Sequence, residues 1–213
     1  MAAAGTGTVF VISAPSGAGK TTLCRRLLDD LEGIDFSVSC TTRPPRPGEQ
    51  EGVDYYFVDR TEFERRRAAG EFVEWAVVGG DLYGTSQAAV RQALAGGRDL
   101  LLDIDTQGAK SIRGRMPEAI LIFILPPDRE ALRTRLVKRG SESPEGMNGR
   151  LALAAGEIGK AGLYDYVVFN DDLESAYRAL RAVVEAARCR YSRQAGRVER
   201  VARSFGVRDA PAP

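Results

Sequence analysis

A glycine-rich turn between an apolar run and a helical pattern limits the folds open to this chain more than any other feature. The turn occupies residues 13–22, with the sequence SAPSGAGKTT, and it follows the strand-like run 9–12. The helical pattern after it places four leucines on one face: Leu23, Leu27, Leu28 and Leu31. Glycines let successive backbone N–H groups converge on an anion, and the positive end of the next helix faces the same anion. The pattern therefore predicts an α/β fold with a phosphate-binding loop after its first strand.

Two side chains at the end of this turn carry the predicted phosphate chemistry. In this motif Lys20 reaches the β- and γ-phosphates of a nucleoside triphosphate, and the Thr21 hydroxyl binds Mg²⁺. Ala14 stands where the strict pattern has its first glycine, while the strand–turn–helix context is intact. The alternative is a tight strand-to-helix turn with an exposed lysine.

The composition removes several classes of chemistry. The 213 residues include no histidine, which excludes a histidine general base, a Ser–His–Asp triad and a histidine-bound metal. A net charge of +1 gives no indication of a nucleic acid or membrane partner, and no apolar stretch approaches the ~18 residues of a membrane span. Three cysteines without CxxC spacing, and an N-terminus without signal-peptide features, predict a cytoplasmic protein with reduced thiols.

Strand-like and helical segments alternate over most of the chain, which is typical of a parallel sheet with helices on both faces. Between residues 36 and 86 the alternation gives way to several short strands, the first at 36–40, and one helix. We therefore predict a core P-loop domain at 1–35 and 87–190, and an inserted small mixed or antiparallel subdomain at 36–86. Residues 191–213 are predicted to form one last helical turn and then disorder.

Four helix starts are specific enough to be tested. Thr61 with Glu64 matches a capping box that opens a helix ending near residue 69. Ser86 is predicted to cap a helix through residue 94, and Asp128 a helix that reaches residue 138. A further helix is predicted to begin near Arg150.

A second phosphate site is indicated by two arginines in a proline-stiffened loop. Arg43 and Arg46 lie three residues apart, and Tyr55 follows. Arginines grip phosphate with two parallel hydrogen bonds, so this pair suits a second phosphorylated ligand. The alternative is a solvated surface loop.

Glu74 points to a guanine base. It lies in a strand-like run between apolar neighbours, where a carboxylate is costly unless it is paired. Guanine offers N1–H and its exocyclic amine as adjacent donors to one carboxylate, whereas adenine presents a bare acceptor there. The hydroxyls of Ser39 or Thr85 are candidate donors to guanine O6. The alternative is that Glu74 faces water on an edge strand.

Two further clusters complete the predicted site. Asp103 and Asp105 end a buried strand, where α/β proteins bind ligands, and they are candidates to orient the waters of Mg²⁺ or the acceptor. Arg135, Arg139 and Arg150 flank a flexible charged segment, which predicts a closing lid at about 139–150. The alternatives are a charged strand end and a solvated helix end.

With these residues in place, the chain resembles the guanylate kinase family over about residues 9–190. The matching motifs are APSGAGKT, SCTTRPPRPGE, GVDYYFV, EFVEWA, YGT, LLLDIDTQG, RLVKRGSES and YDYVVFND. The resemblance implies phosphoryl transfer from ATP to GMP, with Mg²⁺ as cofactor and deoxy-GMP as an expected second acceptor. It gives no indication of the oligomeric state.

The resemblance also implies residue roles. The residues implied to bind ATP are Ala14, Pro15, Ser16, Gly17, Ala18, Gly19, Lys20, Thr21, Thr22, Asn170 and Asp171. Those implied to bind the GMP phosphate are Arg43, Arg46, Tyr55 and Tyr83, and those implied to bind the base are Ser39, Glu74, Thr85 and Asp103. The implied catalytic residues are Lys20, Arg43, Arg135, Arg139 and Arg150.

Three other functions fit parts of the sequence. A binding module of the same fold would use the Arg43 site without catalysis, but it would not need Lys20 and the lid arginines. A kinase for another phosphorylated acceptor would be expected to lack the pair Glu74 and Thr85. A GTPase switch is suggested by the DTQG run at 105–108, but the chain has no NKxD-like guanine motif.

Overall fold

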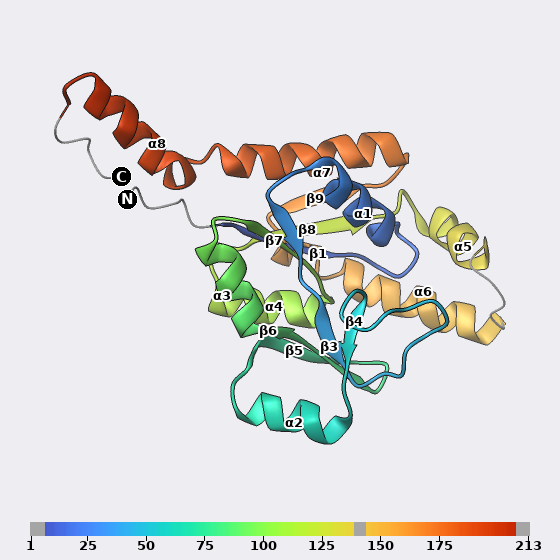
Figure 1. The fold of residues 1–213 in the computed structure, drawn as a ribbon. Helices are drawn as coiled ribbons and strands as arrows, with labels where there is room; N and C mark the ends of the chain where they lie inside the picture. The colour runs from blue at the N-terminus through green and yellow to red at the C-terminus, as the bar shows by residue number, and fades with distance from the viewer. Residues whose placement is uncertain (1–6, 139–143, 208–213) are drawn as a thin grey trace.

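Two sheets organise the chain (Figure 1). The computed structural model describes residues 7–138 and 144–207. The first sheet is parallel throughout, in the order β2 (Ile34–Phe36), β7 (Asp99–Asp103), β1 (Val9–Ser13), β8 (Ile120–Leu125) and β9 (Tyr166–Phe169). The predicted parallel α/β core is confirmed.

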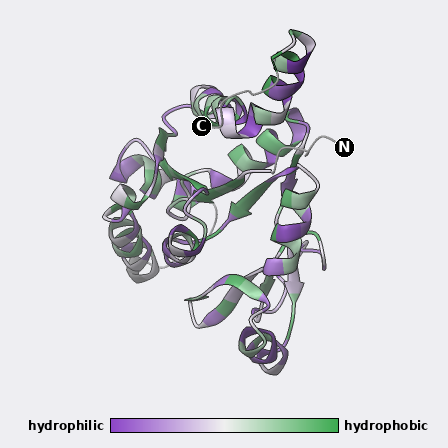
Figure 2. Cartoon of the chain, turned by 90° about the vertical axis from the view of Figure 1, so that its left-hand side faces the viewer, coloured by the Kyte–Doolittle hydropathy of each residue, from purple (hydrophilic) through white to green (hydrophobic). Residues whose placement is uncertain are grey.

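Helices cover both faces of this sheet because its strands are apolar on both sides. Phe10 and Ile12 of β1 pack with α1 (Lys20–Asp30) and α7 (Leu173–Arg188). The alternate residues Val9 and Val11 pack on the other face with α3 (Gln87–Ala95) and α4 (Thr106–Arg115). Figure 2 shows the hydrophobic strands running through the middle of the molecule. Because all five strands are parallel, their carboxyl ends lie on the same side of the sheet, and the loops that follow them meet there.

The second sheet is smaller and mixed. Its order is β4 (Tyr55–Phe57), β3 (Ser39–Thr41), β6 (Asp81–Ser86) and β5 (Phe72–Val78). β3 pairs with β4 in parallel, whereas β6 runs antiparallel to both β3 and β5. α2 (Arg60–Ala68) covers this sheet through Phe63, which stacks on Phe72 at 4.6 Å between ring centroids. The predicted boundaries at 36 and 86 stay predictions.

The single strand predicted at 36–40 is wrong. The structure divides this segment between β2 of the first sheet and β3 of the second. Ser37 N still donates to Leu101 O of the first sheet at 2.9 Å, while Cys40 already pairs with Gly84 of the second. The chain therefore crosses from one sheet to the other within three residues, and a run of strand-forming residues does not reveal such a crossing.

Two of the predicted helix starts are confirmed. Ser86 Oγ accepts from Ala89 N at 3.3 Å at the start of α3. Asp128 Oδ1 accepts from Ala131 N at 2.7 Å at the start of α5 (Arg129–Lys138). Both side chains satisfy a backbone donor that the first helical turn leaves without a partner.

Three helix predictions are wrong. α2 is capped by Asp59, whose carboxylate accepts from the backbone N of Glu62 at 2.8 Å, and so Thr61 lies inside the helix. α6 (Pro144–Ile158) begins six residues before Arg150, because proline suits a first helical position and glycines lower helix stability without ending the helix. The predicted tail contains α8 (Tyr191–Ser204), a helix of 14 residues. Residues 208–213 lie outside the described residues.

A buried carboxylate explains why the chain stays ordered into α8. Asp99 is 1% exposed and accepts from Thr8 N at 2.8 Å, from Arg188 Nε at 2.8 Å and from Arg193 Nη2 at 2.9 Å. These bonds join the last turn of α7 and the first turn of α8 to the start of β7. From there α8 projects away from the sheet (Figure 1). None of the helices within the described ranges is long and apolar enough to cross a membrane.

Candidate active site

The glycine-rich turn forms the loop between β1 and α1. Gly17 and Gly19 have φ values of 90° and 97°, which side chains rarely permit, and Ala18 N donates to Pro15 O at 3.0 Å. Lys20 is the first residue of α1, followed by the exposed Thr21. The backbone N–H groups of the loop and the start of the helix therefore lie where the predicted phosphates would bind.

Asn170 and Arg135 hold this loop from the opposite side. Asn170 is 5% exposed, and its Nδ2 donates to Ala18 O at 2.7 Å. Arg135 Nη2 donates in turn to the carbonyl oxygen of Asn170 at 2.7 Å. A Cβ at Gly19 would lie 2.2 Å from Asn170 Nδ2, so this contact also requires glycine at that position. Asn170 thus supports the loop, while the implied binding of ATP by Asn170 and the exposed Asp171 stays a prediction.

We expect Asn170→Ala to raise the KM for ATP about tenfold, because the Ala18 carbonyl loses its buried donor at 2.7 Å and keeps only the longer contact from Arg135 Nη1 at 3.5 Å. The KM for GMP should change by less than about twofold, because no acceptor residue contacts Asn170. Steady-state kinetics with each substrate varied in turn separates the two. Equal losses for both substrates, together with a lowered melting temperature, would instead indicate general destabilisation.

Lys20 forms an ion pair with Asp103, the last residue of β7. Asp103 is the register partner of Ile12 in β1, so the two strand ends carry the loop and its counter-charge side by side. Burial is the largest single influence on the pKa of Lys20 and would lower it, but the charge of Asp103, its hydrogen bond and the smaller effects of Cys24 and Tyr55 together raise the pKa. Lys20 is therefore held cationic at the loop. The predicted contact of Asp103 with the base stays a prediction.

The oxygen donors near the loop fit Mg²⁺. Thr21 is exposed on the first turn of α1, and the partly exposed Asp103 carboxylate is paired with the preceding residue, Lys20. Such a pair suits an ion that takes most of its ligands from phosphate and water. Asp105 is less available, because it caps α4 through Gly108 N at 2.8 Å and accepts from Gln107 Nε2 at 3.1 Å. Among the described residues, no group of three or more His, Cys, Asp or Glu side chains could hold a metal ion.

The predicted phosphate-gripping residues of the second sheet lie together. Arg43 Nε donates to Tyr83 OH at 3.2 Å, and its guanidinium lies 5.4 Å from the ring centre of Tyr55. Tyr55 and Tyr83 meet edge to face at 5.8 Å. Arg46 is exposed in the loop that joins β3 to β4. Three of the four residues therefore form one cationic and hydroxyl-bearing surface.

Glu49 is a residue that the sequence analysis missed. Both of its carboxylate oxygens accept from Arg43 Nη2, at 2.8 and 3.0 Å, and one accepts from Arg46 N at 2.7 Å. The hydrogen bonds that Arg43 donates to Glu49 are the main cause that raises the pKa of Arg43. The sequence signal for this contact was the position of Glu49, three residues after Arg46 and six residues after Arg43.

Glu74 is buried, so the alternative in which it faces water is wrong. It is 3% exposed on β5, and Thr85 Oγ1 of β6 donates to its Oε1 at 2.5 Å. Burial is the main cause that raises the pKa of Glu74 to about 7, and the hydrogen bond from Thr85 opposes this shift. Ser39 is buried one residue before Cys40, the partner of Gly84, and therefore lies across from Thr85. These three side chains line one buried polar position.

Tyr55 connects the two halves of the site. Burial raises the pKa of Tyr55, and the negative charge of Asp103 raises it further while Lys20 lowers it. A residue of the second sheet thus lies within electrostatic reach of the ion pair at the loop.

The lid residues are only partly described. Arg135 lies on α5, and its Nη1 donates to Ala18 O of the loop at 3.5 Å. Arg150 is exposed on α6, and Arg139 lies outside the described residues. Two charged residues were missed, Glu157 in the last turn of α6 and Lys160 just after it. Lys160 Nζ donates to Thr106 Oγ1 at 3.1 Å, and burial raises the pKa of Glu157 while the charge of Lys20 opposes this. Their spacing of three residues was the only sequence signal.

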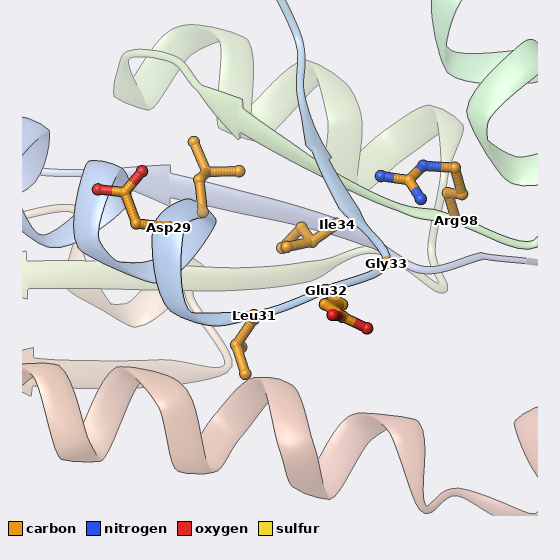
Figure 3. Close-up of a pocket in the computed structure, with 7 residues that line it drawn as sticks. Asp29, Leu31, Glu32, Gly33, Ile34 and Arg98 are labelled. Carbon is orange, nitrogen blue, oxygen red and sulfur yellow. The ribbon is translucent and has the colours of Figure 1, made fainter.

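A large hollow lies elsewhere in the molecule. A pocket of about 620 Å³ is lined by the end of α1, the start of β2 and Arg98, with Asp29 and Arg98 on either side of Ile34 (Figure 3). The pocket lies at the N-terminal end of β2, whereas the glycine-rich loop and Asp103 lie at the C-terminal ends of β1 and β7. None of the predicted site residues lines it. This pocket is therefore separate from the candidate site, which is defined by the contacts among its side chains.

The loop between β1 and α1, with lysine at the start of the helix, places this chain among the P-loop phosphate-binding proteins. Residues 6–187 match the family model described as guanylate kinase. The chain belongs to the guanylate kinase family.

Its relatives match over both sheets. The chain is 52% identical over 184 residues to a guanylate kinase of Symbiobacterium thermophilum, a match that covers 86% of this chain and 87% of that protein. It is 50% identical over 191 residues to a guanylate kinase of Dechloromonas aromatica, covering 90% and 95%. The crystal structure of guanylate kinase from Anaplasma phagocytophilum superposes with a TM-score of 0.79 at 38% identity, covering 96% of this chain and 98% of that one.

Proposed function

We propose that this chain catalyses reversible transfer of the γ-phosphoryl group of ATP to GMP, giving ADP and GDP, with deoxy-GMP as a second acceptor. The observation that carries the choice of acceptor is the buried pair of Glu74 and Thr85. It lies in the same small sheet as the Arg43–Tyr83 contact. One surface thus offers a buried acceptor for a base and a cationic grip for a phosphate.

The Glu74 carboxylate selects guanine. Thr85 occupies its Oε1, and the carboxylate can accept from the two adjacent donors of guanine, N1–H and the exocyclic amine. Adenine has an acceptor at N1, which a buried carboxylate repels. Because the pKa of Glu74 is about 7, binding of guanine favours loss of the proton from this carboxyl. Ser39 is the donor proposed for guanine O6, because the one hydroxyl proton of Thr85 is already donated to Glu74 Oε1.

The phosphate of GMP is bound by Arg43, Arg46, Tyr55 and Tyr83. Arg43 is already oriented by Glu49 and Tyr83, so little side-chain freedom is lost when it binds. Two arginines also neutralise part of the repulsion between the GMP phosphate and the phosphates of ATP.

Transfer needs no protein nucleophile. A phosphate oxygen of GMP attacks the γ-phosphorus of ATP, a new P–O bond forms, and the bond to the β-phosphate oxygen breaks with its electron pair leaving on ADP. Lys20 and the loop N–H groups stabilise the charge on the transferring group. Mg²⁺, bound by Thr21 and by Asp103 through water, would supply positive charge at the β- and γ-phosphates.

The lid arginines complete the proposal. Arg135 reaches the loop from α5, and Arg139 and Arg150 stand on either side of the segment that would close over the phosphates. Closure excludes water, which would otherwise accept the phosphoryl group. The described thiols Cys24, Cys40 and Cys189 are free, which supports a reducing compartment such as the cytoplasm.

Product analysis tests the reaction class. With ATP, GMP and Mg²⁺, chromatography should show ADP and GDP in equal amounts, and excess EDTA should abolish both, because the phosphates lose their metal charge. ADP with inorganic phosphate and no GDP would identify a nucleotide hydrolase instead and contradict the proposal.

A further inference from the structure

Gly108 leaves space for the buried carboxylate of Glu74. It is the third residue of α4, and a Cβ at this position would lie 2.6 Å from Glu74 Oε2 and 3.2 Å from its Cδ. Cβ atoms essentially never approach another heavy atom below 3.0 Å, so any side chain here requires the carboxylate or the helix to move. Gly108 has helical geometry rather than a positive φ, so this contact, not backbone strain, is what requires glycine.

The first turn of α4 is not free to move away. Asp105 Oδ1 caps it by accepting from Gly108 N at 2.8 Å, and Gln107 Nε2 donates to Val77 O of β5 at 3.2 Å. At the far end of the helix, Arg115 Nη1 donates to Val73 O of β5 at 2.8 Å. α4 is thus bound to the strand that carries Glu74 at both ends.

Glu74 is confined from its other side as well. Thr85 Oγ1 holds Oε1 at 2.5 Å, and the side chain is 3% exposed. The carboxylate of Glu74 therefore lies between the Thr85 hydroxyl of the second sheet and the backbone of Gly108 in α4. Displacing Oε2 would rotate the carboxylate away from any ligand that reads both of its oxygens.

We propose that Gly108 is a positioning residue for guanine specificity, which holds the Glu74 carboxylate in the orientation that accepts two adjacent base donors. This inference rests on the proposed function. It extends that function to a residue of α4, a helix that covers the first sheet, and this residue touches no substrate. It predicts discrimination against purine acceptors that lack the exocyclic amine, such as IMP.

α4 provides a matched control. Gly114 lies in the same helix, is exposed, and has no heavy atom within 4 Å of a Cβ built on it. Gly108→Ala and Gly114→Ala therefore make the same chemical change in the same helix, and both favour helix formation. They differ in burial and in the atoms that the new Cβ meets, which at Gly108 are the Glu74 carboxylate and, at 3.2 Å, Ile104 Cδ1.

The test measures kcat/KM for GMP and for IMP, and KM for ATP, in the parent and in both variants. Gly108→Ala should lower kcat/KM for GMP by about 10- to 100-fold and bring the GMP-to-IMP ratio towards one, with the KM for ATP unchanged. Gly114→Ala should stay within about twofold of the parent in all three. If Gly108→Ala keeps the parental GMP-to-IMP ratio, the inference is overturned.

A second variant keeps the test decisive if Gly108→Ala folds poorly. Glu74→Asp withdraws the carboxylate by one methylene, so adding Gly108→Ala to it should cost less than about threefold in kcat/KM for GMP. Equal costs in both backgrounds would overturn the inference. The parent protein is assayed first, because a parent that phosphorylates no GMP would overturn the proposed function itself.

Discussion

Lys20→Ala should lower kcat for phosphoryl transfer by roughly 10²–10³-fold. The lysine is the first residue of α1, at the end of the glycine loop, and it is held cationic by Asp103. Its removal takes away the positive charge that faces the transferring group. It also leaves the Asp103 carboxylate uncompensated close to the phosphates, which adds repulsion.

Single-turnover measurement with saturating ATP and GMP isolates this chemical step from binding. Lys110→Ala is the matched control, because Lys110 is exposed on α4 and should leave kcat within about twofold. The melting temperature of Lys20→Ala shows whether the fold is intact. A folded Lys20→Ala with a kcat within tenfold of the parent would contradict the role given to the loop.

Glu74→Gln should abolish most use of GMP and at the same time stabilise the protein above pH 7. Glutamine keeps an oxygen for the Thr85 hydroxyl, but its amide presents donors where guanine also presents donors. We expect kcat/KM for GMP to fall about 10²–10³-fold, because two buried donors of the base lose their acceptor.

The stability gain follows from the pKa of Glu74. In the unfolded chain this carboxyl ionises near 4.5, whereas in the folded chain burial raises its pKa to about 7. Between these values the folded state binds more protons, so the free energy of unfolding of the parent falls as pH rises and then levels above about 7. At pH 8 Glu74→Gln should be more stable than the parent by about 1–3 kcal/mol, and below pH 4.5 this difference should vanish.

Denaturant unfolding at pH 5 and pH 8 measures this difference, and Glu118→Gln on the exposed surface is the control that should show none. Kinetics provide a second readout. The KM of the parent for GMP should rise as pH falls from 8 to 6, since protonated Glu74 cannot accept both base donors, whereas Glu74→Gln should show no such titration. A parent whose KM for GMP is independent of pH over this range would argue against a carboxylate that reads the base.

Most of the correct predictions came from signals among neighbouring residues, although the capping box at Thr61, which is also such a signal, was wrong. The loop, the caps at Ser86 and Asp128, and the apolar strand β1 all depend on residues within a few positions of each other. The arginine pair and Glu74 were also found, because charge in a proline-rich loop or between apolar neighbours is unusual on its own.

The contacts that the sequence could not predict join distant parts of the chain. Gly108 approaches Glu74 across the two sheets, and Asn170 reaches back to Ala18 at the first loop. The anchoring of α8 by Arg193 on Asp99 is of the same kind. A glycine or an asparagine has no sequence signal for such a partner. The basic composition after residue 190 concealed a helix whose start depends on a carboxylate in another strand.

The most direct test of the proposed function is the rate of ADP formation from ATP and Mg²⁺ with GMP, AMP, CMP and UMP as separate acceptors. Each assay uses equal acceptor concentrations, and GDP formation is followed in the GMP reaction. The arrangement of Glu74, Thr85 and Arg43 predicts rapid turnover with GMP and none comparable with the other three. Equal turnover with AMP and GMP, or no turnover with any acceptor, would contradict it.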